Sequence, residues 1–477
     1  MTTLHAARYL WLTASAAFLI VACGGGGGSG ETTAGIDRGG ITIVSGPVTG
    51  FGSVHVNGIR YSTTGATFTI DDQPGVESDL RVGQVVRIEG KVDPAGTTGT
   101  ASKVVFDDEV EGPVQAIDLP ASRLTVVGRS VLVGPATSFD DSIVPRTLDG
   151  LAVGDRVEIS GLVAADGTVQ ATRIERKPAA SAVEVKGLVT ALDTTARQFV
   201  LGGLEVSYAT AQLDGFASGQ PANGDRVEAF GTLQGGAVLI ASRLERESLS
   251  SGDSDDQGDY EGLVTRFVSP ADFDVAGQRV TTSSSTRYER GTAADLGLDV
   301  KVEVEGRFDA AGVLVAGKVE FRRDADTELE GLVEAVDVSA GTLVVLGVTF
   351  RVDPLTRFED HSDNDVQRFG LADIAVGDFV EVDAYDDGSG YLATRIERDG
   401  MQDEVQLEGR ALDVAAPNFT VAGVPVTTDA NTEFRDNNGG QIGSSAFFQA
   451  AASGPVVEVR GRLIGNVVLA ERAELED

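Results

Sequence analysis

The chain has 477 residues, more than one ordinary domain holds, so several compact units are expected. Its 73 acidic and 38 basic residues give a formal net charge of −35, and such a surface repels nucleic acid and anionic lipid headgroups. The hydrophobic content of 42% is too high for a disordered chain, and the single cysteine excludes an intrachain disulfide.

The first 40 residues have the pattern of a secretion leader followed by a tether. An apolar run over 9–22 has the length of a signal-peptide core and is too short to span a bilayer comfortably. The run ends in the tetrapeptide IVAC, which closes at Cys23 and resembles the lipobox of bacterial lipoproteins. The resemblance implies that a helical signal peptide, 1–22, is removed and that Cys23 is acylated. An ordinary secretory leader with an incidental cysteine is the alternative.

A glycine-rich tether over 23–40 follows the lipobox. Gly24 stands where lipoproteins retained in the inner membrane commonly carry aspartate, so the resemblance implies the outer membrane of the cell envelope, facing the periplasm or the surface. No second apolar stretch of spanning length occurs in the sequence. Contact with the membrane is therefore expected through the lipid anchor only.

Internal similarity is the strongest signal in the remaining sequence, where four landmarks recur in the same order. The first landmark is a glycine followed by a short aliphatic strand, at Gly46, Gly112, Gly187, Gly262, Gly331 and Gly409. These glycines lie 66, 75, 75, 69 and 78 residues apart. Such a spacing is that of a whole small domain and not of a short solenoid coil.

The other three landmarks lie inside each repeat. A strand pair is broken at a glycine, as at Asn57-Gly58, a combination typical of a tight hairpin. The most regular landmark is the G-D-x-V-E stretch over 154–161, which recurs over 224–231 and 377–384. Between the strand pair and the G-D-x-V-E stretch stands a Thr-x-aromatic triplet. It begins at Thr137, Thr286, Thr356 and Thr432.

Within 154–161, Val157 and Ile159 alternate with polar residues, and this period of two predicts a strand with one buried face. Gly161 is expected to end the strand at a sharp bend. The recurring glutamates sit in separate units, which argues against a shared acid–base role. They are expected on the solvent face, paired with Arg173-type residues: Glu158, Glu228, Glu303, Glu381 and Glu458.

Short antiparallel strands with glycine corners, repeated in each unit, are typical of a small closed or half-closed barrel. One helical turn over 371–376 would stand between the third and fourth strands, where the OB-fold places a helix, and a different Greek-key barrel is the alternative. We therefore predict an all-β fold, a tandem array of six small five- to six-stranded Greek-key or OB-like barrels after an N-terminal signal helix.

The landmarks give boundaries for each predicted unit. A stretch rich in Ser and Asp is predicted to be an acidic linker, 247–259, between the first three repeats and the last three. The predicted repeats cover 41–109, 110–178, 183–246, 260–323, 328–398 and 404–477.

The repeated pattern G-x-V, T-x-F, L-x-x-G-D-x-V-E-V-x-G and A-x-x-I-E, behind a lipoprotein leader, resembles the bacterial domain of unknown function 5666 (DUF5666). The resemblance covers nearly all of the chain after the leader. Its landmarks are structural, so it supports the fold and implies no established activity. Repeats 4 and 6 depart from the pattern at Asp299 and Pro455.

Candidate chemistry centres on the few histidines. Serine-hydrolase, zinc-protease, C-x-x-C and Walker sequences are all absent. His55 is flanked by Val54 and Val56, which should face the core, so His55 is expected to point into solvent. His361 lies in an acidic stretch, where a solvated loop and a metal site formed with Asp360 and Asp363 are the two interpretations.

Calcium is the cofactor that the acidic turns suggest. Asp253 and Asp255 begin a D-x-D-x-x-G stretch like that of a calcium loop. Position twelve of that loop is Val264 and not the bidentate glutamate of an EF-hand, so charged turns that maintain solubility are the alternative. Apart from calcium, no cofactor is expected.

These observations favour a non-enzymatic, lipid-anchored envelope protein whose repeats act as a spacer or as a multivalent binding module. A calcium-dependent binding or adhesion protein is the second hypothesis, and an envelope hydrolase that depends on His361 is the third. Nucleic-acid binding is not expected, because aromatic residues make up only 6% and the charge is strongly negative. The sequence identifies no ligand or protein partner.

Overall fold

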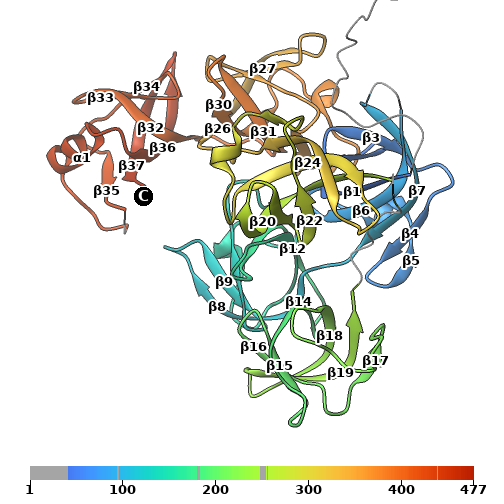
Figure 1. The fold of residues 1–477 in the computed structure, drawn as a ribbon. Helices are drawn as coiled ribbons and strands as arrows, with labels where there is room; N and C mark the ends of the chain where they lie inside the picture. Colours follow the sequence, from blue (N-terminus) through green and yellow to red (C-terminus); the bar gives the residue numbers. More distant parts are fainter. Residues whose placement is uncertain are drawn as a thin grey trace, which may run out of the picture. The chain divides into compact units, whose positions relative to one another are not determined.

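The computed structural model describes residues 41–93, 96–179, 183–247, 254, 256–437 and 439–476. The predicted signal helix, tether and lipidation site Cys23 lie outside these residues, as do Asp253 and Asp255. The described residues form 37 strands, four 3-10 turns and one α-helix (Figure 1). No helix among them is long and apolar enough to cross a bilayer.

The strands fall into six consecutive groups, one for each predicted repeat. Repeat 1 holds β1 (Thr42–Gly50), β2 (Val54–Val56), β3 (Ile59–Ser62), β4 (Thr67–Ile70), β5 (Gln73–Gly75), β6 (Val85–Val92) and β7 (Thr98–Phe106). Repeat 2 holds β8 (Val110–Asp118), β9 (Arg123–Val126), β10 (Arg129–Leu132), β11 (Ser138–Phe139), β12 (Arg156–Val163) and β13 (Val169–Arg176). Repeat 3 holds β14 (Val183–Asp193), β15 (Gln198–Leu201), β16 (Leu204–Ser207), β17 (Gln212–Asp214), β18 (Arg226–Gln234) and β19 (Val238–Arg246).

The second half of the chain repeats the pattern. Repeat 4 holds β20 (Gln257–Ser269), β21 (Asp272–Val275), β22 (Gln278–Thr281), β23 (Arg287–Glu289), β24 (Lys301–Phe308) and β25 (Leu314–Phe321). Repeat 5 holds β26 (Thr327–Asp337), β27 (Thr342–Val345), β28 (Val348–Arg351), β29 (Arg357–Asp360), β30 (Phe379–Asp386) and β31 (Tyr391–Asp399). Repeat 6 holds β32 (Val405–Ala415), β33 (Asn418–Val421), β34 (Val424–Thr427), β35 (Glu433–Arg435), α1 (Ser444–Ala451), β36 (Val456–Ile464) and β37 (Val467–Leu475).

Each group closes into a small barrel, as predicted. In repeat 2, β8, β9 and β10 form an antiparallel meander, and β10 pairs in parallel with β13. β13 pairs with β12, and β12 returns to β8 and closes the barrel. The same five pairings recur in the other five repeats. The five barrel strands, counted in chain order, are β8, β9, β10, β12 and β13. They close in the order first-second-third-fifth-fourth, which is the Greek-key order of OB-like barrels.

The connection between the third and fourth strands of the barrel also follows the OB-like plan. Repeat 6 has α1 at this place, and the other repeats for which the structure describes a helical turn have η1 (Glu77–Asp79), η2 (Leu148–Gly150), η3 (Ala293–Asp295) and η4 (Leu371–Asp373). The turn predicted over 371–376 is therefore confirmed as η4.

The threonine landmark ties this connection to the last strand. Thr356 Oγ1 donates a hydrogen bond to the carbonyl of Ala393, at 2.8 Å, and accepts one from the Asp353 amide, at 3.0 Å. Thr137, Thr286 and Thr432 make the same pair of bonds in their repeats. Both partners are backbone groups. The threonine therefore provides hydrogen bonds for one amide and one carbonyl at the bend of the barrel.

Glycine at the end of the G-D-x-V-E stretch marks a bulge. β12 continues to Val163, so the prediction that it ends at Gly161 is wrong. The pairing with β13 shifts between Ser160 and Gly161, and a Cβ atom at Gly161 would lie 2.4 Å from the Gln170 carbonyl oxygen. A bulge bends a strand sharply without ending it, which lets one strand serve two sides of a barrel.

The barrels are joined in pairs through their first strands. β8 pairs with β14, which joins repeats 2 and 3, and β26 pairs with β32, which joins repeats 5 and 6. Repeats 1 and 4 are joined by parallel pairing of β1 with β20. One apolar core cluster runs through repeats 2 and 3, and another runs through repeats 5 and 6.

The pairing of β1 with β20 corrects the predicted linker. Thr42 pairs with Gln257 and Val44 pairs with Asp259, so the last three residues of the predicted linker 247–259 belong to a strand. The composition of this stretch is polar, and a polar segment becomes a strand here because β1 on one side and β24 on the other supply its hydrogen-bond partners.

Candidate functional site

Rows of carboxylates cross the outer faces of the barrels. In repeat 5, Glu330 of β26 stands opposite Glu381 of β30, which stands opposite Glu397 of β31. Like charges placed directly opposite each other destabilise a sheet, so each row needs compensation. The equivalent rows are Glu111–Glu158–Glu175, Glu261–Glu303–Glu320 and Glu408–Glu458–Glu474, and repeat 3 has Lys186–Glu228–Glu245.

The prediction that the recurring glutamates face solvent is wrong. Glu158, Glu228 and Glu303 are only 2%, 5% and 2% exposed. They lie on the outer faces of their own barrels, where neighbouring strands, side chains and repeats cover them. Period-two alternation tells which side of a strand a residue occupies, but it does not tell whether another part of the chain packs on that side.

The predicted pairing with Arg173-type residues is confirmed in repeats 4 to 6. Lys318 lies 3.3 Å from Glu303, Arg472 lies 2.9 Å from Glu458, and Arg395 contacts Glu381. In repeat 2 the arrangement differs, because Arg173 contacts Glu175, while Lys177 contacts Glu158.

An acidic groove of about 900 Å³ lies between repeats 2, 5 and 6. Ten acidic residues and three arginines line it. The pairing of β26 with β32 sets Glu328 opposite Glu408 of the repeat 6 row, and Glu328 lies two residues before Glu330 of the repeat 5 row. Carboxylates of both repeats thus form one wall of the groove. Its size is within the range of ligand sites, and its charge selects for cations.

Crowding of carboxylates shifts the protonation of the groove. The pKa of Glu330 is raised to about 7, mainly by burial and to a smaller extent by the negative charge of Asp399. Burial also raises the pKa of Glu328 and Glu381 well above the usual glutamate range. A cation in the groove would favour the ionised form of these groups, so the groove is expected to bind cations and protons in competition.

The arginines of the groove hold its deepest carboxylates. Arg395 contacts Glu381, Asp383 and Glu397, and all four side chains are at least largely buried. Arg146 reaches across from repeat 2 and contacts Glu397 and Asp399. These contacts link residues about 250 positions apart in sequence, which shows that repeat 2 packs against repeat 5.

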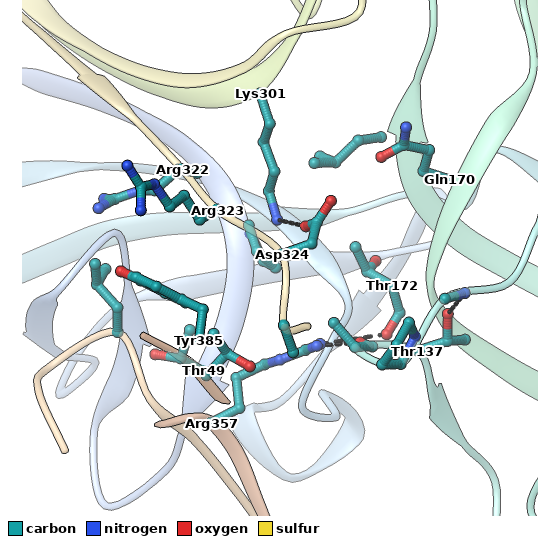
Figure 2. A pocket seen from close by; sticks show the side chains of 18 of the residues that line it. Thr49, Thr137, Gln170, Thr172, Lys301, Arg322, Arg323, Asp324, Arg357 and Tyr385 are labelled. Carbon is teal, nitrogen blue, oxygen red and sulfur yellow. Dashed lines mark hydrogen bonds and ion pairs between the residues drawn. The ribbon is translucent and has the colours of Figure 1, made fainter. Parts of the chain in front are cut away.

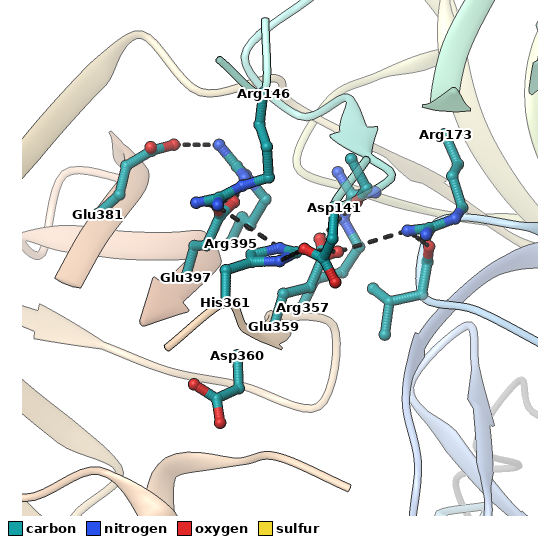
Figure 3. A network of polar contacts seen from close by, with 12 residues as sticks. Asp141, Arg146, Arg173, Arg357, Glu359, Asp360, His361, Glu381, Arg395 and Glu397 are labelled. Atoms are coloured by element: carbon teal, nitrogen blue, oxygen red, sulfur yellow. Dashed lines mark hydrogen bonds and ion pairs between the residues drawn. The ribbon is translucent and has the colours of Figure 1, made fainter. Parts of the chain in front are cut away.

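Figure 3 shows the position of His361 in this junction. Its Nε2 lies 3.5 Å from Glu397 and 3.8 Å from Glu359, and its Nδ1 contacts Asp141 of repeat 2. Burial lowers the pKa of His361, but the nearby carboxylates of Glu359 and Glu397 outweigh burial and raise the pKa to about 9. The ring is therefore an imidazolium at neutral pH, and a metal ion at this place would have to displace its proton.

The structure does not bring Asp360, His361 and Asp363 together. Asp360 turns away from the ring (Figure 3). Its two oxygens accept hydrogen bonds from Arg398 at 2.9 and 2.6 Å. Asp363 is exposed. The interpretation of His361 as a solvated loop residue is wrong, because its side chain is 8% exposed.

The expectation that His55 points into solvent holds only in part. Val54 and Val56 are buried, as predicted, but His55 is half-buried and its Nε2 is enclosed. Burial, together with the nearby charge of Arg60, lowers the pKa of His55. His55 is therefore neutral at neutral pH, whereas His361 is charged.

A second, smaller cavity is lined by more basic residues than acidic ones. It measures about 200 Å³ and is lined by residues of repeats 1, 2, 4 and 5 (Figure 2). Arg357 is buried there and donates hydrogen bonds to the carbonyls of Thr172 and Ala136. Arg323 lies over the ring of Tyr385, and Lys301 lies 3.5 Å from Asp324. This cavity is too small for most ligands, so the groove is the better candidate site.

Six segments of the chain match the family described as Domain of unknown function (DUF5666), over residues 39–105, 111–175, 186–245, 261–320, 330–397 and 408–474. No curated protein matches the chain. Among solved structures, a chain titled drosophila Unr CSD456 is 16% identical, with 44% of this chain and 98% of that chain covered and a TM-score of 0.14. The six matched segments coincide with the six barrels.

Proposed function

The chain belongs to the DUF5666 family, and from that premise we propose that it is a non-enzymatic, lipid-anchored envelope protein whose docked barrels bind cationic partners. The observation that carries the proposal is the acidic groove between repeats 2, 5 and 6. Its carboxylate wall belongs to a pattern found in several repeats, and repetition of one weak site raises overall affinity through multivalency.

Binding is favoured over a spacer role by the contacts between distant repeats. A spacer gains reach when its units follow one another in a row. Here Arg146 of repeat 2 contacts Glu397 and Asp399 of repeat 5, and β1 pairs with β20. The chain thus folds back on itself, which gives up reach and creates concave surfaces between barrels.

The proposed anchor is Cys23, and the proposed location is the outer membrane of the cell envelope. The lipobox-like IVAC tetrapeptide supports the anchor, and Gly24 in place of aspartate supports the location. Palmitate labelling in cells tests it, because a Cys23→Ser variant should lose the label and leave the membrane fraction. A labelled variant would contradict it.

The ligand class is tested with an eight-residue oligolysine peptide, titrated calorimetrically into the full chain. The Glu330→Gln/Glu408→Gln variant should bind the peptide about tenfold more weakly, because two groove carboxylates lose their charge. Affinity should also rise between about pH 6 and 8, since Glu330, with a pKa of about 7, becomes ionised over that interval.

The matched control is Glu205→Gln/Glu471→Gln, which removes the same charge from two exposed residues outside the groove. This variant should bind the peptide as the wild-type chain does. Equal weakening in both variants would mean that the peptide responds to net charge alone, and the groove would lose its assigned role.

A further inference from the structure

A second group of acidic residues lies away from the groove, where the connection between repeats 1 and 2 meets repeat 2. Asp108 follows β7, Glu111 lies in β8 and Glu158 lies in β12. One carboxylate oxygen of each residue lies within 4.8 Å of the other two. Asp108 and Glu158 are 1% and 2% exposed and Glu111 is half-buried, so the cluster is largely shielded from solvent.

Asp108 is the unusual member of this cluster. It has no hydrogen bond or ion pair with any residue that the structure describes, and its Oδ1 is enclosed. The Oε1 of Glu111 is enclosed and without a donor as well. Carboxylates in protein interiors are paired with cations, hydrogen-bonded or bound to metals, so these two oxygens need a positively charged partner.

The neighbouring lysines are already engaged. Lys177 contacts Glu158, and Lys186 lies 3.1 Å from Glu228 and 3.8 Å from Glu247. Glu184 adds a further carboxyl group, because it stands opposite Glu111 in the pairing of β8 with β14. The cluster therefore carries more negative charge than its lysines can offset.

Protonation behaviour agrees with this charge excess. The pKa of Asp108 is raised well above its usual range, mainly by burial and to a smaller extent by the negative charge of Glu158. Burial raises the pKa of Glu158 to about 8, although Lys177 opposes the shift. The cluster therefore has two ways to become neutral, by binding protons or by binding a cation.

We propose that Asp108, Glu111 and Glu158 bind one hard divalent cation of the calcium type, which fixes the connection between repeats 1 and 2 on the second barrel. All three ligands are carboxylate oxygens, the donors that calcium prefers. An oxygen spacing of up to 4.8 Å fits an ion at the centre, since Ca–O distances are about 2.3–2.6 Å. This proposal is independent of cation binding in the groove.

The acidic group formed by Glu328, Glu381 and Asp383 is a poorer site for a metal. Its oxygens are equally close together, but Arg395 contacts both Glu381 and Asp383. In that group a cation contacts two of the three carboxylates, whereas in the other group Lys177 contacts Glu158 alone and Asp108 has no ion pair among the described residues. The unpaired carboxylate of Asp108 therefore makes its group the better candidate for a metal site.

The test uses the full chain after treatment with a chelator. Calcium chloride is titrated calorimetrically into the wild-type chain and into Asp108→Asn and Asp108→Asn/Glu158→Gln variants, with magnesium chloride as a second arm. The wild-type chain should bind one more calcium ion than the double variant, or bind it at least about tenfold more tightly. Asp363→Asn is the control, because it removes an exposed carboxylate of the predicted loop and should leave calcium binding unchanged.

Thermal melting separates a metal site from a merely structural cluster. Without calcium, Asp108→Asn should melt at or above the wild-type temperature, because an amide in place of a buried carboxylate removes charge repulsion and breaks no hydrogen bond. With calcium, the melting temperature of the wild-type chain should rise and that of the variant should not. Equal calcium responses in both proteins, or no calcium binding by the wild-type chain, would overturn the proposal.

Discussion

Replacement of Arg395 by methionine is expected to lower the free energy of unfolding by about 3–5 kcal/mol at about pH 8. Arg395 contacts the carboxylates of Glu381, Asp383 and Glu397, and its side chain is 7% exposed. Without the guanidinium, three buried carboxylates face one another with less positive charge nearby. Urea unfolding of the wild-type chain and the Arg395→Met variant measures the difference.

The loss should depend on pH in a defined direction. Removal of Arg395 raises the pKa of Glu381 further, because the arginine opposes the effect of burial. A carboxyl group whose pKa is raised in the folded state costs stability as pH rises through that pKa. The variant should therefore recover part of its stability at about pH 5, where these carboxyl groups take up protons.

The control for this experiment is Arg462→Met. Arg462 pairs with Glu471 on the same kind of strand surface, but the two side chains are 64% and 47% exposed. An exposed pair of this kind contributes about 0–1 kcal/mol. If Arg395→Met cost no more than Arg462→Met, the carboxylate rows would not depend on the buried arginine.

The second large effect concerns His361 and the pH dependence of stability. The folded-state pKa of His361 is about 9, above the ordinary value of 6.5. Its contribution to stability is therefore fully present below about pH 6.5 and is lost as pH rises through 9. The wild-type chain should lose up to ~3 kcal/mol over this interval, and His361→Gln should lack this part of the decline.

Other groups also titrate near neutral pH, so the difference between the two proteins is the quantity to measure. Glu330 and Asp259, with pKa values of about 7 and 8, destabilise both proteins as pH rises. His55→Gln is the control, because burial lowers the pKa of His55 and places its titration below the interval. Parallel pH curves for the wild-type chain and His361→Gln would show that the ring carries no charge in the junction.

The sequence predicts the barrels well because their determinants are local and repeated. Val157 and Ile159 alternate with polar neighbours within one strand, and both are buried. Asn57-Gly58 predicts a tight hairpin, and β2 and β3 pair directly across it. The threonine of each T-x-aromatic triplet binds backbone groups of its own repeat.

The packing of repeats against one another could not be predicted in this way. Gln257 and Asp259 belong to a polar stretch, and they become part of a strand through pairing with β1 of repeat 1 and β24 of repeat 4. His361 lies in an acidic stretch that reads as a solvated loop, and repeat 2 covers it with Asp141. Such contacts depend on which outer faces meet, and the outer faces of all six barrels carry similar polar residues.

One signal in the sequence could have located the site. Glu158 and Glu175 recur at equivalent places in later repeats, and a basic residue stands two positions before the second glutamate, as Arg173 does in repeat 2. Because the two strands form a hairpin, the glutamates must lie opposite each other. Opposed like charges are unfavourable on a free surface, so their repetition indicates faces that meet cations or other barrels.

The docking of repeat 2 on repeat 5 is the central claim, because the groove and the environment of His361 depend on it. A double-mutant cycle between Arg146→Met and Asp399→Asn in urea unfolding tests it most directly, since the two residues belong to different repeats and contact each other. A coupling free energy of about 1–3 kcal/mol is expected for this partly buried pair. A coupling within error of zero would mean that the two repeats do not dock and would contradict the account.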